Sequence, residues 1–301
     1  MIQTVMKVIQ TVVLHVAILA FLCQCNNNDP DPNINIPDDN FLNALIDLGV
    51  DANRDGKISP SEAEVISSLE LNGKNISDLS GIEYFINLDT LYCWENQLTT
   101  LNLSENATLT MLICTDNQLT NLNVTNCKNL KRLYCGNNHL TSLDISNNLD
   151  LEWLWCQENQ LTSLDISSNL LLEYLACNVN ELRGLDVSNN VSLEVFSCNS
   201  NYLTLLDLSK NTILIKLNCA NNQLTSLDVS NNLELAVLIC GSNQLTRLDL
   251  RNNTKLRNIY FSDMPSLTKV CVWTIPFPPD LLMYEIYFSG SPNYYFTMDC
   301  S

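Results

Sequence analysis

The chain has 301 residues, 46% of them hydrophobic, which is enough for a sizeable buried core. Its 33 acidic and 15 basic residues give a formal net charge of −18 at pH 7. Binding to nucleic acid or to anionic lipid headgroups depends on clustered Lys and Arg, so this composition argues against both as partners.

The N-terminus carries the features of an export signal. A largely apolar run at 12–22 is too short to span a bilayer, and only Lys7 precedes it, so we interpret residues 1–25 as a signal peptide. Cys25 closes the run, as in bacterial lipoprotein signals, which favours lipidation at Cys25. Simple secretion after cleavage near Cys25 is the alternative. We expect residues 26–35 to be a disordered polar tether, and the protein to be a lipoprotein of the outer membrane or cell surface, or freely secreted.

Leucine, cysteine and asparagine recur with a period of 21 residues through most of the chain. One unit has the pattern Leu-x-x-Leu-x-Cys-x-x-Asn-x-Leu, as at 151–161. The first leucines are Leu88, Leu109, Leu130, Leu151, Leu172, Leu193, Leu214, Leu235 and Leu256, the cysteines are Cys93, Cys114, Cys135, Cys156, Cys177, Cys198, Cys219 and Cys240, and the asparagines are Asn96, Asn117, Asn138, Asn159, Asn180, Asn201, Asn222 and Asn243. This periodicity is typical of leucine-rich repeats and predicts a repeat domain over 69–262.

The period also predicts the architecture. In each unit the second leucine and the cysteine point inward from a short strand, and their neighbours point outward. Successive strands stack into a parallel sheet on the concave face, and each repeat buries its apolar side only against its neighbours. Twenty-one residues leave little room for a helix, so we predict a mainly β solenoid in which a second extended segment, such as 164–167, fills the convex side. The asparagines are expected to bond to the backbone of the turns, one repeat after another.

The file of cysteines has two interpretations. A buried thiol packs as a small hydrophobic group, so one cysteine per repeat can simply fill the core. Disulfides or a metal along the file are the alternative, but neighbouring strands hold their Cβ atoms farther apart than a disulfide prefers, and zinc needs converging ligands. We therefore favour the structural role. Cys127, on a turn, is expected to be a lone thiol.

Residues 51–62 match the EF-hand calcium loop at each diagnostic position. The predicted ligands are the side chains of Asp51, Asn53 and Asp55, the carbonyl of Lys57, Ser59 through water, and both carboxylate oxygens of Glu62. Gly56 would make the sharp turn, and helices are expected over 41–48 and 61–67. We predict one structural Ca²⁺ in an N-terminal cap at 36–68, with an ion-free Asx-rich turn as the alternative. Because the loop is single, a structural clip is favoured over a calcium switch.

The segment 36–41, the calcium-type loop, the segment 76–82 and the Cys/Asn repeats together resemble secreted leucine-rich repeat proteins of Bacteroidetes-type bacteria, with internalin-like repeats. This resemblance implies a place at the cell surface or outside the cell, and it defines no ligand.

The period ends after Phe261, and residues 263–301 are predicted to form a β-rich C-terminal cap with short strands at 286–288 and 294–296. An open solenoid end exposes its core, so a cap is needed. Cys271 and Cys300 are the only cysteines outside the signal and the ladder besides Cys127, and in an exported protein they are expected to form a disulfide.

The sequence does not point to an enzyme. His15 lies in the signal and His139 stands alone on a turn, so no Cys/His or Ser/His pair can be assembled. One array of carboxylates recurs with the repeat, at Asp144, Asp165, Asp186, Asp207, Asp228 and Asp249. We interpret this array as structural, with casual cation binding as the alternative.

The outward positions of the first repeats carry large aromatic side chains. The predicted patch consists of Tyr92, Trp94, Met111, Ile113, Arg132, Tyr134, Trp153, Trp155 and Tyr174. Exposed aromatics gathered on one face usually mark a binding site, although aromatics also favour strands for packing alone. We therefore predict a non-catalytic recognition or adhesion protein that binds an extracellular protein or polysaccharide through the concave face. A structural spacer or matrix component without a specific ligand is the alternative.

Overall fold

The computed structural model describes residues 32–278 and 285–300, which belong to one compact unit beginning at Pro32. The predicted signal at 1–25 and its lipidation site Cys25 lie outside the described residues. The predicted disordered tether is wrong at its C-terminal end. Ile34 is only 8% exposed, and its N–H donates to the carbonyl of Ile58 at 2.8 Å, so this apolar residue anchors the start of the fold.

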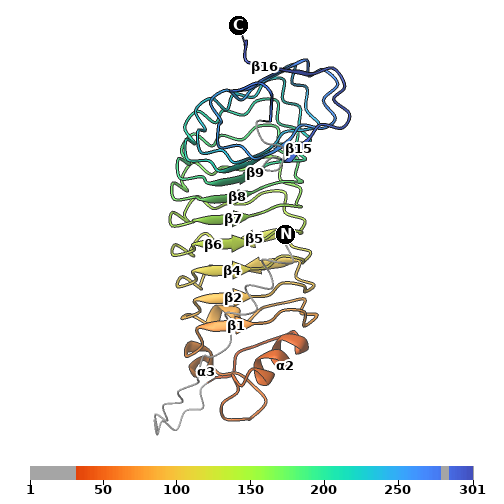
Figure 1. Ribbon diagram of the computed structural model, residues 1–301. Coiled ribbons are helices and arrows are strands. Elements are labelled where there is room, and N and C mark those ends of the chain that lie inside the picture. Colours follow the sequence, from red (N-terminus) through yellow and green to blue (C-terminus); the bar gives the residue numbers. More distant parts are fainter. Residues whose placement is uncertain (1–31, 279–284, 301) are drawn as a thin grey trace. The chain divides into compact units, whose positions relative to one another are not determined.

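A parallel β-solenoid makes up most of the described chain, which confirms the predicted fold class (Figure 1). Its main sheet contains, in order, β1 (Ser68–Glu70), β2 (Thr90–Tyr92), β4 (Met111–Ile113), β6 (Arg132–Tyr134), β7 (Trp153–Trp155), β8 (Tyr174–Ala176), β9 (Val195–Ser197), β10 (Lys216–Asn218), β11 (Val237–Ile239), β13 (Asn258–Tyr260) and β15 (Glu285–Tyr287). Within the repeats, partners in neighbouring strands stand 21 residues apart, as Arg132 and Trp153 do. The sequence period is therefore the strand register.

The core follows from the alternation of side chains along each three-residue strand. In β7 the central Leu154 is fully buried while Trp153 and Trp155 point outward. Cys156 and Leu161 continue the buried side into the turn. Because every repeat contributes the same positions, the core is a continuous file of leucine and cysteine side chains, each packed against the same position of the next repeat.

Shorter sheets lie on the other side of the solenoid. One pairs β3 (Thr100–Asn102) with β5 (Asn121–Asn123), and the other contains β12 (Arg247–Asp249), β14 (Lys269–Cys271) and β16 (Tyr295–Thr297). The segment 164–167 forms no strand, although Leu164 and Ile166 are buried as expected. The alternation of apolar residues thus predicted which side chains enter the core, but not where neighbouring backbones come within hydrogen-bonding distance.

Buried asparagines connect the repeats, as predicted. The Nδ2 group of Asn159 donates to the carbonyls of Cys135 and Cys156, at 3.0 and 3.2 Å, and its Oδ1 accepts from the N–H of Leu140. One side chain therefore satisfies backbone groups of two successive repeats that water cannot reach. The residue before it, Glu158, has a φ of 55°, and the left-handed turn recurs at the same position of the other repeats.

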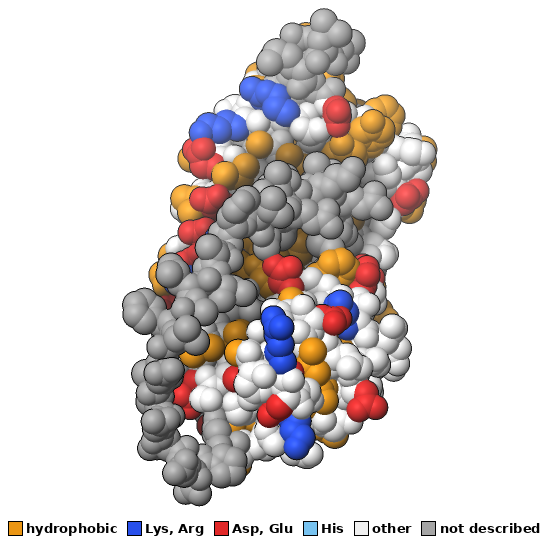
Figure 2. Space-filling view, turned by 90° about the horizontal axis from the view of Figure 1, so that it is seen from below, with side chains coloured by type: hydrophobic (Ala, Val, Ile, Leu, Met, Phe, Trp, Pro, Cys, Tyr) orange, Lys and Arg blue, Asp and Glu red, His pale blue; other side chains and the backbone are white. Residues whose placement is uncertain are grey.

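The N-terminal end is closed by two short helices, α2 (Asp39–Asp47) and α3 (Pro60–Glu64), followed by the 3₁₀ helix η1 (Ile82–Tyr84). The first helix begins two residues before the predicted 41–48, because Asp38 caps it, and the second ends before the predicted 61–67 does, because the chain turns into β1. Figure 2 shows this end of the solenoid, with acidic and basic side chains scattered among polar ones.

The C-terminal residues continue the solenoid instead of forming a separate cap. β15 pairs with β13 in the main sheet, and β16 pairs with β14 on the other side, so the predicted strands are present but shifted by about one residue. Within the described part of the chain, no helix combines the length and apolar character needed to cross a bilayer.

Candidate functional site

The concave face of the main sheet carries most of the predicted patch. Arg132 lies 5.6 Å from the centre of the Trp153 ring, and that ring stacks on Tyr174 with centroids 4.3 Å apart and planes inclined by 14°. The three side chains come from β6, β7 and β8, at the same place in successive repeats. The guanidinium group and the two aromatic rings form one column, held by cation–π and stacking contacts.

A second aromatic column runs beside the first. The rings of Tyr134 and Trp155 meet edge to face, 5.0 Å apart and inclined by 76°. The Nε1 atom of Trp155 and the Oε1 atom of Gln157 are buried and have no hydrogen-bond partner among the residues described here. Both atoms are shielded from solvent, so a ligand does not reach them in this arrangement of the side chains.

Two members of the predicted patch are less exposed than expected. Ile113 is 7% exposed and Tyr134 is 8% exposed, so the prediction that both lie open to solvent is wrong. In the register of the sheet, Ile113 lies between Tyr92 and Tyr134, and Tyr134 packs against Trp155, which accounts for part of their burial. The other predicted positions, Tyr92, Trp94, Met111, Arg132, Trp153, Trp155 and Tyr174, are partly or fully exposed.

Burial also changes the chemistry of the two tyrosines. It raises the pKa of Tyr92, and the negative charges of Glu70 and Asp89 raise it further. Burial likewise raises the pKa of the Tyr134 phenol. Both phenols therefore remain neutral hydrogen-bonding groups at physiological pH.

A charge pattern that we did not derive from the sequence sets the concave face apart. In the strands of the main sheet from β2 to β13, the outward positions carry no acidic residue, and neither does the position just after each cysteine of the ladder. The chain as a whole has a net charge of −18. The charged residues at these positions are Arg132 and Lys216. Beyond the aromatic columns the face becomes rich in amides, where Asn218 donates to the Oδ1 of Asn199 at 2.9 Å. The pattern could have been found by sorting the repeat positions by charge.

The predicted calcium loop at 51–62 contains two left-handed residues and several local hydrogen bonds. Arg54 and Gly56 have φ angles of 64° and 80°, which make the two sharp turns. The carboxylate of Asp51 accepts from the N–H groups of Asp55 and Gly56, at 3.1 and 2.9 Å. The Oε2 atom of Glu62 accepts from the N–H and hydroxyl of Ser59, which completes a capping box at the start of α3.

The oxygen atoms of the loop suit calcium by type, because carboxylate, amide and carbonyl oxygens are the ligands that this hard cation prefers. Their arrangement is more open than a closed coordination shell. Glu62 directs its Oε1 to the N–H groups of Ala52 and Asn53, at 2.9 and 3.1 Å. Among the described residues, the acids of the loop do not bring three carboxylates together with oxygen atoms within 4.8 Å of one another.

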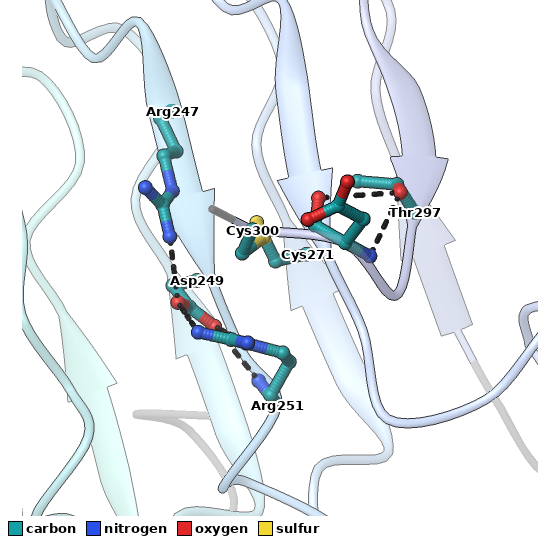
Figure 3. Close-up of a disulfide and its surroundings, with 7 residues drawn as sticks. Arg247, Asp249, Arg251, Cys271, Thr297 and Cys300 are labelled. Carbon is teal, nitrogen blue, oxygen red and sulfur yellow. Dashed lines mark hydrogen bonds and ion pairs between the residues drawn. A yellow bond between two sulfur atoms is a disulfide. The ribbon is translucent and has the colours of Figure 1, made fainter.

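One such group of three lies at the C-terminal end, where Cys271 and Cys300 form a disulfide beside Asp249 (Figure 3). Cys271 pairs with Asp249 in the register of the sheet, so it takes the next place in the file of aspartates. Hydrogen bonds from Arg251 lower the pKa of Asp249, and Arg247 donates to the same carboxylate at 3.0 Å. With its thiols bonded to each other and its carboxylate paired with two arginines, this group is structural.

The remaining aspartates of the file are also engaged locally. Asp144 accepts from the hydroxyl and the N–H of Ser146, at 2.7 and 3.0 Å, and these hydrogen bonds lower its pKa. Asp165 makes the corresponding backbone contact with Ser167. Each carboxylate therefore stabilises the turn of its own repeat, which is the structural role we expected.

The geometry defines the class of protein, a leucine-rich repeat solenoid with a ladder of buried cysteines and a concave aromatic face. No protein-family model matches the chain. The functional domain of InlJ from Listeria monocytogenes, which includes a cysteine ladder, is similar in structure, with a TM-score of 0.75 and 33% sequence identity over 87% of this chain and 63% of that one. The leucine-rich repeat protein LIC12759 of Leptospira interrogans has a TM-score of 0.64 and 23% identity over 76% of this chain and 62% of its own.

A curated relative agrees with this likeness. Internalin J of Listeria monocytogenes serotype 4b (strain F2365) is 39% identical over 70 residues, which are 23% of this chain and 8% of that protein. The chain thus has an internalin-like fold of 21-residue repeats with a cysteine ladder. It spans less than two thirds of the InlJ domain and a small part of Internalin J.

Proposed function

We propose that the protein is a non-catalytic recognition or adhesion protein, which binds an extracellular protein or polysaccharide through its concave face. The observation that carries this proposal is the face itself, where Trp153, Trp155 and Tyr174 form an aromatic surface without acidic residues in a strongly acidic chain. Aromatic residues and arginine are the usual anchors of interfaces.

The test is the loss of binding after Trp153→Ala or Trp155→Ala. A glycan array and a pull-down from neighbouring cells would supply the binding partner, and titration of the tryptophan fluorescence would measure its affinity. We expect each substitution to weaken binding by about 2 kcal/mol or more. The matched control is Ile239→Ala, a partly exposed position four repeats farther along the same face, which should change the affinity little.

Folding provides the control for this experiment. Because Trp153 points outward, its removal should cost about 1 kcal/mol of stability, the value of its contacts with Arg132 and Tyr174. Variants that fold and bind normally would refute the role of the patch and favour the structural spacer. Unfolded variants would contradict the outward orientation assigned to the two tryptophans.

We further propose that one Ca²⁺ binds the loop at 51–62 and stabilises the N-terminal cap. The two left-handed turns and the oxygen donors support this, and binding would require the carboxylate of Glu62 to turn from Ala52 and Asn53 toward the ion. Titration calorimetry should show one site in the wild type and a much weaker one after Glu62→Gln. A chelator should lower the melting temperature, because a ligand bound only to the native state stabilises it. Failure to bind at several millimolar Ca²⁺ would refute the site.

We also propose that the chain is exported by the signal at 1–25 and held at the cell surface by a lipid on Cys25, as its resemblance to secreted proteins of Bacteroidetes-type bacteria suggests. Mass spectrometry of the protein from membranes should find a lipid on the N-terminal peptide. Cys25→Ser should release the protein into the medium. An unmodified Cys25 in mature membrane-bound protein would contradict the anchor.

A further inference from the structure

The aromatic part of the concave face lies between two rows of acidic residues, one along each long edge of the main sheet. We call these rows the acidic rims. The first rim occupies the position just before a strand and consists of Asp89, Glu152, Glu173 and Glu194. The second rim occupies the second position after a ladder cysteine and consists of Glu95, Asp116 and Glu158. Acids are therefore absent from the concave positions but are gathered directly beside them.

Backbone hydrogen bonds hold the rims in register with the strands. The N–H of Glu173 donates to the carbonyl of Glu152 at 2.8 Å, and the N–H of Glu194 donates to the carbonyl of Glu173 at 2.9 Å. Residues of successive repeats are thus about 4.8 Å apart along a rim. Glu152 and Glu158 belong to one repeat, and the chain between them spans at most about 20 Å. The outward side chains of β7 lie within this span.

Most of the rim carboxylates have no cationic partner in their own chain. Within the described part of the chain, Glu152 is the one rim acid that forms an ion pair, with Lys131 at 3.7 Å. The exposed rim acids that form none are Asp89, Glu95, Glu158, Glu173 and Glu194. Cations from outside can pair with these carboxylates, and the net charge of −18 attracts such cations from a distance.

The face and its rims together have the layout of a protein–protein interface. The centre of such an interface is poor in acids and rich in aromatic residues and arginine, and its rim is polar and open to solvent. Here Arg132, Trp153 and Tyr174 form the centre, and acidic residues form the rim on both sides. A partner that matches both parts presents an apolar surface surrounded by lysine and arginine.

The stacking of the central column disfavours a polysaccharide. A sugar ring packs on the flat face of an aromatic side chain. One face of the Trp153 ring is covered by the Arg132 guanidinium, at 5.6 Å, and the other by the Tyr174 ring, at 4.3 Å between centroids. The two neighbours come from the strands on either side of β7, so Trp153 presents its edge to a partner. An edge suits the irregular side chains of a protein surface better than it suits a sugar ring.

From these observations we propose that the partner of the concave face is a protein with a basic surface. Its apolar centre packs on the aromatic residues, and its lysine and arginine side chains pair with the acidic rims. The inference rests on the proposed recognition function and deepens it, because it assigns the partner a class and a charge. Charges at the rim of an interface mainly accelerate association, whereas the desolvated centre slows dissociation. The rims and the aromatic centre should therefore have separate kinetic effects.

Two synthetic peptides of equal length test the charge of the partner, one alternating lysine with tyrosine and the other alternating glutamate with tyrosine. Biolayer interferometry of the immobilised full chain measures association and dissociation rates. We expect the lysine peptide to bind and the glutamate peptide not to bind. Glu158→Gln combined with Glu173→Gln should slow association of the lysine peptide roughly three- to tenfold at about 0.01 M salt. The difference should disappear near 1 M salt, where the Debye length is only about 3 Å.

Asp165→Asn combined with Asp186→Asn is the matched control. It changes the net charge by the same amount on the convex side, and the asparagine oxygens can still accept from the N–H groups of Ser167 and Ser188. Association of the lysine peptide should then change little. All substitutions are at exposed positions, and circular dichroism verifies that each variant is folded.

Equal effects of the two double variants, or equal binding of the two peptides, would overturn the basic partner. Tight binding of an uncharged polysaccharide on a glycan array, unaffected by salt and by the Glu158 and Glu173 substitutions, would overturn it in favour of a glycan. Trp153→Ala separates these failures from failure of the recognition function, because it should accelerate dissociation of whichever ligand binds. Unchanged dissociation from that variant would refute the concave site itself, and with it the basic partner.

Discussion

The carboxylate of Asp38 joins the first helix to the first repeat, and its substitution should detach one from the other. Its Oδ1 accepts from the N–H groups of Asn40 and Phe41 and so caps α2, at 2.9 and 3.0 Å. Its Oδ2 accepts from the N–H and hydroxyl of Ser77 and from the N–H of Asp78, at 2.8, 2.7 and 3.1 Å. Asp38 is 9% exposed, so water replaces few of these contacts when they are lost.

Asp38→Asn keeps one oxygen and replaces the other with a donor. Whichever way the amide turns, either the helix or the Ser77 turn then faces an NH₂ group. Hydrogen bonds to a charged group contribute about 1.5–3 kcal/mol each, and those that share one carboxylate are not additive, so we expect a loss of about 3 kcal/mol. Asp38→Ala should cost about 1 kcal/mol more, because it removes the remaining helix cap as well. Asp39→Asn is the matched control, an exposed acid one residue later, and should have little effect.

The loss should depend on pH. Burial of the Asp38 carboxyl raises its pKa, but hydrogen bonds from Ser77, Phe41 and Asp78 outweigh burial, and the net pKa is lowered. A carboxyl whose pKa is lower in the folded state stabilises the fold above its unfolded pKa of about 3.9, and this contribution is lost as the pH falls through the folded value. Wild type and D38N should therefore differ most at neutral pH and converge as the pH falls below the lowered pKa of the folded state.

Hydrogen exchange of the α2 amides, with urea titrations at pH 7 and at pH 2–3, provides the assay. Exchange should accelerate in α2 before it does in the central repeats, because a solenoid can open locally at one end. A loss of less than about 0.5 kcal/mol at pH 7, or an equal loss at both pH values, would show that the Asp38 carboxylate does not hold the two elements together.

Other changes test other parts of the fold. Asn159→Ala should cost about 2–4 kcal/mol in chemical denaturation, because it leaves the buried N–H of Leu140 without an acceptor and removes one of the two amide donors to the carbonyls of Cys135 and Cys156. A loss below about 1 kcal/mol would contradict the role of the ladder. Val179 has a φ of 55°, a left-handed conformation in which a β-branched residue is strained. Val179→Gly should therefore stabilise the fold by about 1 kcal/mol and raise its melting temperature, and a lower melting temperature would contradict this. Cys271→Ala opens a link between residues 29 positions apart and should cost about 3–4 kcal/mol at the C-terminal end; unchanged proteolysis of that end would contradict it.

The repeat made much of this structure predictable. The period of 21 gave the register of the main sheet, and the inward leucine between Trp153 and Trp155 gave the orientation of both tryptophans. The exposure of Tyr134 was not predictable in the same way, because it depends on the rotamer of Trp155 in the next repeat. Likewise, the apolar pattern gives no hint that Ile34 pairs with Ile58, since a single residue outside the repeats carries no periodic signal.

The cysteine ladder supports a last prediction, that its thiols resist alkylation in the native protein. The described free cysteines, Cys93, Cys114, Cys127, Cys135, Cys156, Cys177, Cys198, Cys219 and Cys240, are all buried. Burial raises the pKa of Cys93, Cys156 and Cys219 to about 12. The thiolate is the reactive form, and at pH 8 such a thiol is ionised to only about one part in ten thousand, against about a quarter for an ordinary cysteine.

Iodoacetamide should therefore label ladder cysteines at least on the order of a thousandfold more slowly than it labels glutathione at pH 8. Peptide mapping by mass spectrometry follows each site separately, and unfolding in guanidinium should make every ladder cysteine react at the ordinary rate. A separate, geometric reason keeps the ladder from forming disulfides. Neighbouring strands hold equivalent Cβ atoms at about 4.8 Å, beyond the preferred span, whereas Cys271 and Cys300 approach from non-equivalent positions. Fast native alkylation of Cys156, in the middle of the ladder, would mean that the repeats open far more readily than a continuous core allows.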